Sequence, residues 1–300
     1  MSIALGSSSM TLKNDTFAKD FFKQNVRLIE IELFSFCNRT CWFCPNSEID
    51  RLSHNVVLQE STYLDIISQL AEVNYDGEIT YSRYNEPLSK KDIILSRIKA
   101  ARDMLPLAKL RTNTNGDYLD RDYIFELRDA GLNELFVQQY LSNNELYDHK
   151  KISSKLFKKA VDLGFTYSII SDIPGQRIEL NLNAVGITTH IRARNFSKEG
   201  SGRTQFLSSI VSSSYVRTKS CSQPFNNMYV DYNGNVMVCC NTRSDIDSHS
   251  GGIMGNVSKN KLWEIFISDA YAPWRSTLGQ DGIKTGICAT CKIGLSTNEF

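Results

Sequence analysis

The sequence has almost no excess of charge of either sign. Its 34 Lys and Arg residues stand against 33 Asp and Glu residues, which leaves a formal net charge of +1 at pH 7. Proteins that bind nucleic acid or membrane surfaces through their overall field carry a clear excess of basic side chains. The composition therefore gives no strong signal for a nucleic acid or a membrane as partner, and only a local basic patch would be compatible with one.

The sequence also lacks long apolar runs. None approaches the ~18–20 consecutive apolar residues of a membrane-spanning helix. The first 17 residues have neither a basic segment nor a long apolar core, so they do not resemble a signal peptide. We expect a cytoplasmic protein, and in that reducing compartment the eight cysteines are better interpreted as metal ligands or catalytic thiols than as disulfides.

Internal repeats and low-complexity tracts are absent too, and from residue 28 strand and helix patterns alternate along the chain. The expected strands cover residues 27–36, 77–83, 108–114, 134–140, 166–172, 177–182 and 189–194, and the expected helices cover 59–73, 90–105, 120–131 and 153–164. Repeated strand–helix units predict an α/β fold, in which a parallel sheet is open or curled into a partial barrel with helices outside.

The pattern changes near residue 195. We expect an N-terminal arm at residues 1–25, a first domain at 26–195, a Ser- and Gly-rich linker at 196–214 and a second domain at 215–300. In the second domain, residues 227–240 predict a β-hairpin because apolar-alternating arms flank Asn233–Gly234. Residues 261–278 predict a helix that is interrupted at Pro273.

Three closely spaced cysteines, Cys37, Cys41 and Cys44, follow the first expected strand in a C-x3-C-x2-C pattern. A barrel places such a loop at its C-terminal mouth. Three thiolates can ligate three irons of a cubane cluster and leave the fourth iron open to a substrate or cosubstrate. The alternative is a structural zinc site, but such sites use four ligands and no fourth ligand lies nearby in the sequence.

This loop resembles the signature of the radical S-adenosylmethionine (SAM) superfamily. The resemblance implies a partial (β/α)6 TIM-like barrel, a 4Fe-4S cluster on Cys37, Cys41 and Cys44, and SAM bound to the open iron. In that family, electron transfer into the sulfonium releases methionine and a 5′-deoxyadenosyl radical that abstracts a substrate hydrogen. The resemblance also implies an electron donor such as flavodoxin or ferredoxin, and gives Phe43 the usual aromatic position before the last cysteine.

The segment Arg83-Tyr84-Asn85-Glu86-Pro87 resembles the family's Gly-Gly-Glu-Pro segment at the end of the second strand. By that resemblance Glu86 binds the ammonium group of SAM, with Asn85 beside it. Tyr84 and Asn85 stand where glycines are usual. Asn tolerates positive φ, so we expect the turn to survive at Asn85 and Tyr84 to line the substrate cavity. Taken alone, this segment would be an ordinary turn before a helix.

Further candidates for cofactor contacts end the third and fourth expected strands. Asn113 and Asn115 lie in a segment that resembles the family's Thr-Asn-Gly turn near the ribose and methionine of SAM, although a role in the turn alone is equally open. Gln138 and Gln139 replace a small hydroxyl residue. Because strand side chains alternate, one of them points into the barrel, and Gln138 is our candidate.

The other five cysteines are Cys221, Cys239, Cys240, Cys288 and Cys291. Four soft ligands from three chain segments imply a closed four-coordinate site, for either zinc or an iron–sulfur cluster. Their arrangement resembles the C-terminal SPASM extension of radical SAM enzymes. A full SPASM domain holds two clusters and needs about seven cysteines, so five imply the shorter Twitch form with one auxiliary 4Fe-4S cluster. The resemblance assigns Cys221, Cys239, Cys288 and Cys291 as its ligands.

Cys240 is then left over. Free cysteines are most often simply buried. The alternative is a catalytic role as a hydrogen-atom donor, as radical epimerases require after hydrogen abstraction.

The resemblance implies net oxidation of a small polar substrate, such as a sugar or aminocyclitol, with the auxiliary cluster as electron acceptor. The 36 residues before Cys37 are too few for the winged domain of many peptide maturases, which favours a small molecule over a peptide. Some polar residues late in the first domain could bind hydroxyls, phosphate or carboxylate, unless they form a solvated face: Arg192, Arg194, Asn195, Lys198 and Arg203. A Cys240-dependent epimerase, a ribosomal-peptide maturase and a non-enzymatic metal scaffold stay open as alternatives.

Overall fold

The computed structural model describes residues 11–53, 55–143, 145–200, 206–207 and 215–293. Ten strands in this part of the chain form one sheet in the order β10-β9-β8-β1-β2-β3-β4-β7-β6-β5. Its centre consists of four parallel strands that follow one another in space as in sequence: β1 (Leu28–Ile31), β2 (Glu78–Thr80), β3 (Lys109–Thr114) and β4 (Glu134–Gln138). The α/β class and the parallel sheet are as predicted.

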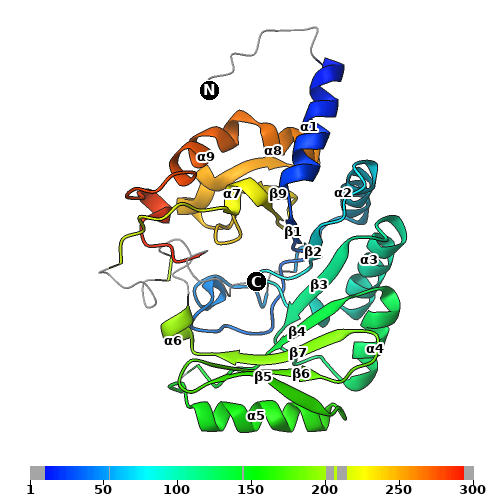
Figure 1. Ribbon diagram of the computed structural model, residues 1–300, viewed down its shortest axis with the longest axis vertical. Coiled ribbons are helices and arrows are strands. Elements are labelled where there is room, and N and C mark those ends of the chain that lie inside the picture. The colour runs from blue at the N-terminus through cyan, green and yellow to red at the C-terminus, as the bar shows by residue number, and fades with distance from the viewer. Residues whose placement is uncertain (1–10, 54, 144, 201–205, 208–214, 294–300) are drawn as a thin grey trace.

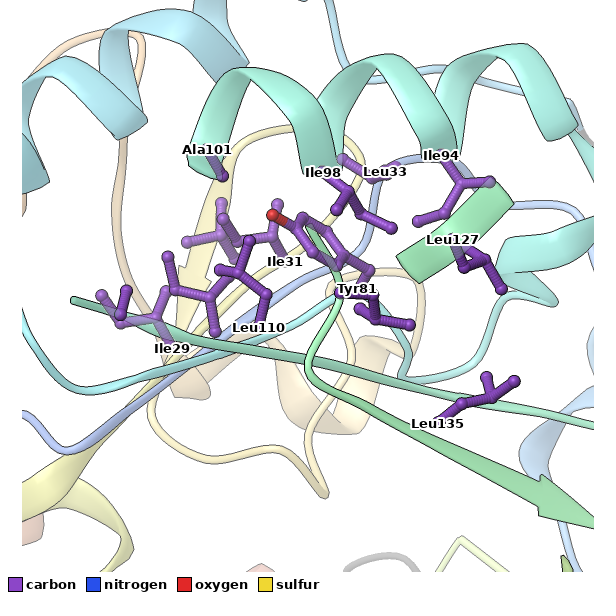
Figure 2. Packing of buried hydrophobic residues seen from close by; sticks show 14 of the residues in the cluster. Ile29, Ile31, Leu33, Tyr81, Ile94, Ile98, Ala101, Leu110, Leu127 and Leu135 are labelled. Atoms are coloured by element: carbon purple, nitrogen blue, oxygen red, sulfur yellow. The ribbon is translucent and has the colours of Figure 1, made fainter. Parts of the chain in front are cut away.

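Three helices connect these strands along one face of the sheet: α2 (Glu60–Glu72), α3 (Lys91–Met104) and α4 (Arg121–Ala130) (Figure 1). Figure 2 shows the packing between sheet and helices, where Ile29, Leu110 and Leu135 lie on the sheet side and Ile98 comes from α3. All four side chains are fully buried. Burying a side chain of this size stabilises the fold by about 1.5–3 kcal/mol. The alternation of the strands leaves their other face free for polar side chains.

The regular strand–helix alternation ends after α5 (His149–Asp162). The next three strands are β5 (Tyr167–Ile173), β6 (Arg177–Leu182) and β7 (Thr188–Arg194), and both β5–β6 and β6–β7 are antiparallel. Three residues separate β5 from β6 and five separate β6 from β7, which is too short for the crossover that a parallel pair needs. Only β7 continues the parallel sheet, next to β4.

The N-terminal segment differs from the predicted arm, because Thr11–Asn25 forms helix α1. Ala18, Phe22 and Val26 are buried, at the spacing of one helix face. The ring of Phe22 meets that of Phe266 edge-on, with ring centroids 5.8 Å apart. Phe266 belongs to α8 (Leu262–Ile267), so the partner that stabilises α1 comes from the far end of the sequence and local patterns could not reveal it.

The predicted hairpin is present as β8 (Asn227–Val230) and β9 (Asn235–Met237), and β10 (Ile253–Asn256) pairs with β9. Gly234 adopts φ +79° in the turn, a conformation that suits glycine. The hairpin does not stand apart from the first domain, because β8 pairs with β1 in parallel from Leu28 opposite Asn227 to Ile31 opposite Val230. One sheet therefore spans both predicted domains.

The remaining helices are α6 (Phe196–Glu199), α7 (Gln223–Asn226), α8 and α9 (Ala272–Leu278). The predicted break in the last helical region lies before Pro273, which is in the first turn of α9, where its missing N–H costs no hydrogen bond. Within the described ranges, none of the helices has the length and apolar character that crossing a bilayer would require.

Candidate active site

A cavity of about 290 Å³ lies over the polar face of the sheet. It is lined by residues at the carboxyl ends of the parallel strands, where α/β folds place their ligand sites. The strands contribute polar side chains from one face, because opposed residues in neighbouring strands point the same way. Those that line the cavity are Glu30, Thr80, Ser82, Arg111, Asn113, Gln138, Arg177, Glu179, Arg192 and Arg194.

The first cysteine loop forms one wall of this cavity, and Cys37, Cys41 and Cys44 all line it. The loop closes on itself through a hydrogen bond from the Cys44 N–H to the Cys41 carbonyl at 2.9 Å. Neighbouring loops hold it in place. The Nε of Arg39 donates to Asp117 at 2.7 Å, and the amide of Asn143 donates to the Thr40 carbonyl at 2.7 Å.

When no metal is bound, burial is the main influence on the protonation of the Cys37 and Cys41 thiols. It raises the pKa of Cys37 and that of Cys41 to about 12 each, and the negative charge of neighbouring thiolates adds to the effect. Without a bound metal, both groups are therefore neutral at physiological pH. A metal centre would supply the positive charge that stabilises adjacent thiolates, so the donor set fits a metal with soft ligands.

Glu86 lies on the same wall and is almost completely buried. Its carboxylate accepts hydrogen bonds from the Thr114 hydroxyl at 2.6 Å, the Leu88 N–H at 3.0 Å and the Asn115 N–H at 2.7 Å. Burial nevertheless raises the pKa of Glu86 to about 7, and the hydrogen bonds oppose this shift only in part. An ammonium group bound nearby would favour the ionised carboxylate.

The turn at Asn85 forms by a different route from the predicted one. Asn85 does not adopt the left-handed conformation, because within the described ranges Asn74 is the one residue other than glycine with a positive φ. Instead the side-chain oxygen of Asn85 accepts from the Arg83 N–H at 3.1 Å and closes the turn. Tyr84 lines the cavity, and its hydroxyl donates to the Cys240 carbonyl at 2.9 Å.

The other predicted cofactor residues also line the cavity: Phe43, Asn85, Asn113, Asn115 and Gln138. Gln138 rather than Gln139 faces it, because Gln139 contributes to a neighbouring pocket on the other side of Tyr140. The ring of Phe43 stacks on that of Phe196 in α6, with centroids 3.7 Å apart and an angle of 4° between the ring planes. The start of the predicted linker therefore packs against the cysteine loop.

The second cysteine group forms a separate pocket. Cys221, Cys239, Cys288 and Cys291 line it together with apolar residues such as Trp274. Burial raises the pKa of the Cys221, Cys239 and Cys288 thiols, and Cys288 reaches about 12. The four thiols are partly buried and line one space, so they suit a metal centre with soft ligands, as those of the first loop do.

Consecutive cysteines face different spaces at this point of the chain. Cys239 lines the enclosed pocket, whereas Cys240 lines the large cavity. The Cys240 thiol lies 3.6 Å from the side-chain oxygen of Gln223, and the residue is 5% exposed. Cys239 and Cys240 therefore form part of the wall of each space in turn.

A buried arginine that the sequence analysis missed shapes the second pocket. Arg217 is 1% exposed, and its guanidinium donates to the carbonyls of Lys219, Ser220, Cys291 and Ile293. It thereby joins the chain before Cys221 to the chain after Cys288. No sequence motif marks this residue, because all of its acceptors are backbone carbonyls.

Glu30 and Arg83 are further cavity residues without a motif. Glu30 is 5% exposed, and its Oε2 lies 3.7 Å from the Nε of Arg83. Arg83 also donates to the Cys240 carbonyl and to Asn241, at 3.1 Å for the latter. The one available signal was the position of Glu30 in an otherwise apolar strand, where a charged residue is costly without a purpose.

Of the late basic residues, Arg192 and Arg194 line the cavity, and β6 adds Arg177 and Glu179 beside them. Asn195 caps α6, its side chain accepting from the Ser197 N–H at 3.1 Å, and Lys198 is exposed. Arg203 lies outside the described residues. The predicted basic cluster is therefore split between the cavity and the surface.

A buried polar network joins the first strand to the loop after β9. Glu32 accepts from Arg51 at 3.3 Å and from the Tyr229 hydroxyl at 2.9 Å. Asp245 pairs with Arg51 at 3.1 Å and with Arg243 at 2.6 Å. Burial raises the pKa of Glu32, while the two arginines oppose that shift. The network holds the second cysteine group in a defined position beside the cavity.

Comparison with known proteins gives two family matches. A family model described as the radical SAM superfamily matches residues 31–177, and one described as an iron-sulfur cluster-binding domain matches residues 221–292. The first match contains Cys37, Cys41 and Cys44, and the second contains all five later cysteines.

Two curated proteins are similar in sequence. The S-adenosyl-L-methionine-dependent 2-deoxy-scyllo-inosamine dehydrogenase of Niallia circulans is 25% identical over 279 residues, covering 91% of this chain and 95% of the relative. A probable GTP 3′,8-cyclase of Methanocaldococcus jannaschii is 30% identical over 158 residues, covering 49% of this chain and 50% of the relative.

Among solved structures, BtrN in complex with AdoMet and 2-DOIA superposes with a TM-score of 0.61 at 22% identity, covering 85% of this chain and 88% of BtrN. A structure of BtrN in an open conformation gives a TM-score of 0.57 at 22% identity, covering 89% and 92%. These likenesses agree with the predicted fold, an α/β partial barrel followed by a small hairpin and helix region.

Proposed function

Since the chain belongs to the radical SAM superfamily and carries a C-terminal iron–sulfur domain of the SPASM family, we propose that this oxidoreductase acts on a small polar substrate and passes the released electron to a second cluster. Its cofactors are SAM and two 4Fe-4S clusters. The similarity to a dehydrogenase of 2-deoxy-scyllo-inosamine supports a polyhydroxylated ring, such as an aminocyclitol or sugar, as the substrate.

We assign the first cluster to Cys37, Cys41 and Cys44, and the second to Cys221, Cys239, Cys288 and Cys291. One observation supports this assignment: the thiols of each set line one space. Three thiols leave one iron open, whereas four close the coordination shell. The second domain is therefore of the Twitch type, with one cluster.

When bound, SAM and the clusters supply the radical that removes a C–H hydrogen and a one-electron acceptor for the substrate radical. The residues of the chain position these partners. Glu86 binds the ammonium group of SAM through a carboxylate that three hydrogen bonds hold in place. Phe43, Asn113, Asn115 and Gln138 line the space around it.

Oxidation of an alcohol also requires a group that takes the hydroxyl proton, and Glu30 suits this role. Its carboxylate is buried in the cavity wall, and among the described residues its Oε2 accepts no hydrogen bond. The Nε of Arg83 lies 3.7 Å from this oxygen. With a SAM-derived radical to take the hydrogen atom and a second cluster to take the electron, Glu30 would take the remaining proton, and the oxidation would balance.

The observation that carries the proposal is the closed four-thiol pocket directly behind the cavity wall at Cys239 and Cys240. An electron donor such as flavodoxin or ferredoxin would reduce the first cluster. The test is anaerobic reconstitution with iron and sulfide, followed by reaction of SAM with candidate aminocyclitols and sugars. We expect about eight irons per chain and one oxidised product per SAM cleaved. Zinc in both sites, with no 5′-deoxyadenosine, would refute the proposal.

Cys37→Ala and Cys221→Ala give a matched pair for this test. Cys37→Ala removes a ligand of the first cluster, so SAM cleavage should stop. Cys221→Ala removes a ligand of the second, so SAM cleavage should continue without oxidised product. Loss of SAM cleavage in Cys221→Ala, when that variant holds as much of the first cluster as the unmodified enzyme, would contradict the division of roles between the clusters.

Epimerisation is the second candidate, because Cys240 lines the cavity and its thiol can return a hydrogen atom to a substrate radical. An epimerase would leave the redox state of the substrate unchanged and incorporate solvent deuterium. Replacement Cys240→Ala would then abolish turnover, whereas a dehydrogenase would keep its activity. The isotope experiment and the variant together separate the two reactions.

A further inference from the structure

One end of the large cavity is formed by three arginines, Arg177, Arg192 and Arg194, which we call the arginine cluster. In the antiparallel pair β6–β7, Arg177 is directly opposite Arg194 and Glu179 is directly opposite Arg192. Directly opposed side chains point to the same face of a sheet. All three arginines line the cavity.

Two carboxylates near the arginine cluster, those of Glu179 and Glu134, also interact with cations outside the cluster. Glu179 lies 3.2 Å from one ring nitrogen of His190, and Glu134 lies 3.6 Å from the other and 2.7 Å from Lys109. The pair of carboxylates raises the pKa of His190 to about 9, so the imidazole is positively charged at neutral pH. Among the described residues that line the cavity here, the three arginines stand beside one carboxylate, that of Glu179.

Arg192 contacts an aromatic ring of β4 and a polar side chain of β3. Its guanidinium is 4.3 Å from the centre of the Phe136 ring and donates to the Asn113 side chain at 3.0 Å. Burial lowers the pKa of Arg192 to about 10, and the charges of Arg194 and Arg111 add to this effect. Like charges that crowd in a buried site are relieved when an anion binds between them.

We propose that the substrate carries an oxyanion group, a phosphate or a carboxylate, and that the arginine cluster binds it. The planar guanidinium group suits both, because it donates two parallel hydrogen bonds to oxyanions. Binding at this end of the cavity would direct the rest of the substrate towards the cysteine loop and Glu30. The inference rests on the proposed function and specifies its substrate class.

The test is anaerobic calorimetry of the reconstituted enzyme at saturating SAM with three probes: myo-inositol, myo-inositol 1-phosphate and glucuronate. We expect at least one anionic probe to bind about tenfold or more tightly than myo-inositol. Its affinity should fall as NaCl is raised, because salt screens charge. Tighter binding of the phosphate identifies a phosphorylated substrate, and tighter binding of glucuronate identifies a carboxylated one.

Variants Arg177→Gln and Arg194→Gln should weaken the anionic probe about tenfold each and leave the affinity for SAM unchanged within about twofold. Arg27→Gln is the control, since Arg27 is exposed at the start of β1, at the opposite end of the strand from the cavity. An equal loss of SAM affinity in the cluster variants would overturn the proposal, because the arginines would then bind the SAM carboxylate.

The unmodified enzyme also tests the proposal. If it binds the neutral and anionic probes equally, or if binding of the anionic probe does not respond to salt, the arginine cluster does not bind an oxyanion. The same samples are assayed for 5′-deoxyadenosine under dithionite. If SAM is not cleaved, the proposed function itself fails. If SAM is cleaved and the probes bind alike, only the inference about the substrate fails.

Discussion

Of the side chains of the protein, Glu30 has the most direct role in the proposed oxidation, because it accepts the hydroxyl proton. Replacing it by Gln keeps the shape of the side chain and removes the proton acceptor. We expect product formation to fall about 100-fold, within the range of general-base contributions. The measurement is oxidised product per minute under saturating SAM and reductant.

The control for this prediction is Glu72→Gln, because Glu72 is exposed on the outer helix α2 beside Lys19. Iron content and SAM affinity should be unchanged in both variants. Full product formation by Glu30→Gln would assign the proton to another group.

His190 makes the stability of the fold depend on pH. The carboxylates of Glu134 and Glu179, which lie 3.6 and 3.2 Å from its ring nitrogens, raise its pKa from 6.5 to about 9. A cation stabilised in this way contributes fully below pH 6.5, and the contribution disappears as the pH rises through about 9. We expect His190→Gln to cost about 1–3 kcal/mol at pH 6 and much less at pH 9.5. Urea unfolding at both pH values measures this difference, and an equal cost at both would contradict it.

The sequence could group Cys37, Cys41 and Cys44 because spacing within a loop is a local property, whereas only the family resemblance grouped the later cysteines, which come from three chain segments. Glu86, Asn115 and Tyr84 could be found because they follow expected strands in a recognisable order. Glu30 and Arg177 could not, because their role arises only where β1 and β6 place them on the same face of one sheet. The φ of Asn85 was wrong because its own side chain closes the turn.

At the scale of elements, the C-terminal segments depend on Arg217. Its guanidinium satisfies four backbone carbonyls around the second cysteine pocket. Hydrogen bonds to a charged group contribute about 1.5–3 kcal/mol each, so Arg217→Met should release these segments. We expect iron to fall from about eight to about four per chain while SAM cleavage continues.

Lys219→Met is the control for this variant, because Lys219 is largely exposed and pairs only at the surface with Asp281. It should keep the full iron content. If Arg217→Met also kept it, the segments would be held by the cluster or by other contacts rather than by the arginine.

Most elements could be predicted because their patterns are local. The helices α2, α3 and α4 and their strands begin and end within a few residues of the expected positions. α1 could not be predicted, because the surface that stabilises it belongs to α8. The strand pairs β5–β6 and β6–β7 are antiparallel because their connections are short. The short connections are visible in the sequence, but the preceding strand–helix repeats favoured a parallel interpretation.

At the scale of the whole molecule, the pairing of β1 with both β2 and β8 makes the two family regions parts of one sheet. Glu32 and Arg51 strengthen this junction from the buried side. We therefore expect the amides of β1 and β8 to lose protection from hydrogen exchange at the same urea concentration. Mass spectrometry of peptides from both strands measures it. Earlier exchange of β8 and β9 alone would show that the second region unfolds independently.

Cys239 and Cys240 line different spaces, and this affects how the reaction of the enzyme could change in evolution. Cys239 lines the four-thiol pocket that we assign to the electron acceptor, whereas Cys240 lines the cavity that we assign to the substrate. A mutation in the codon for position 240 would change whether a substrate radical can receive a hydrogen atom, and would leave every ligand of the acceptor in place. Oxidation and stereochemical inversion are then neighbouring outcomes in evolution, separated by one side chain rather than by a new fold.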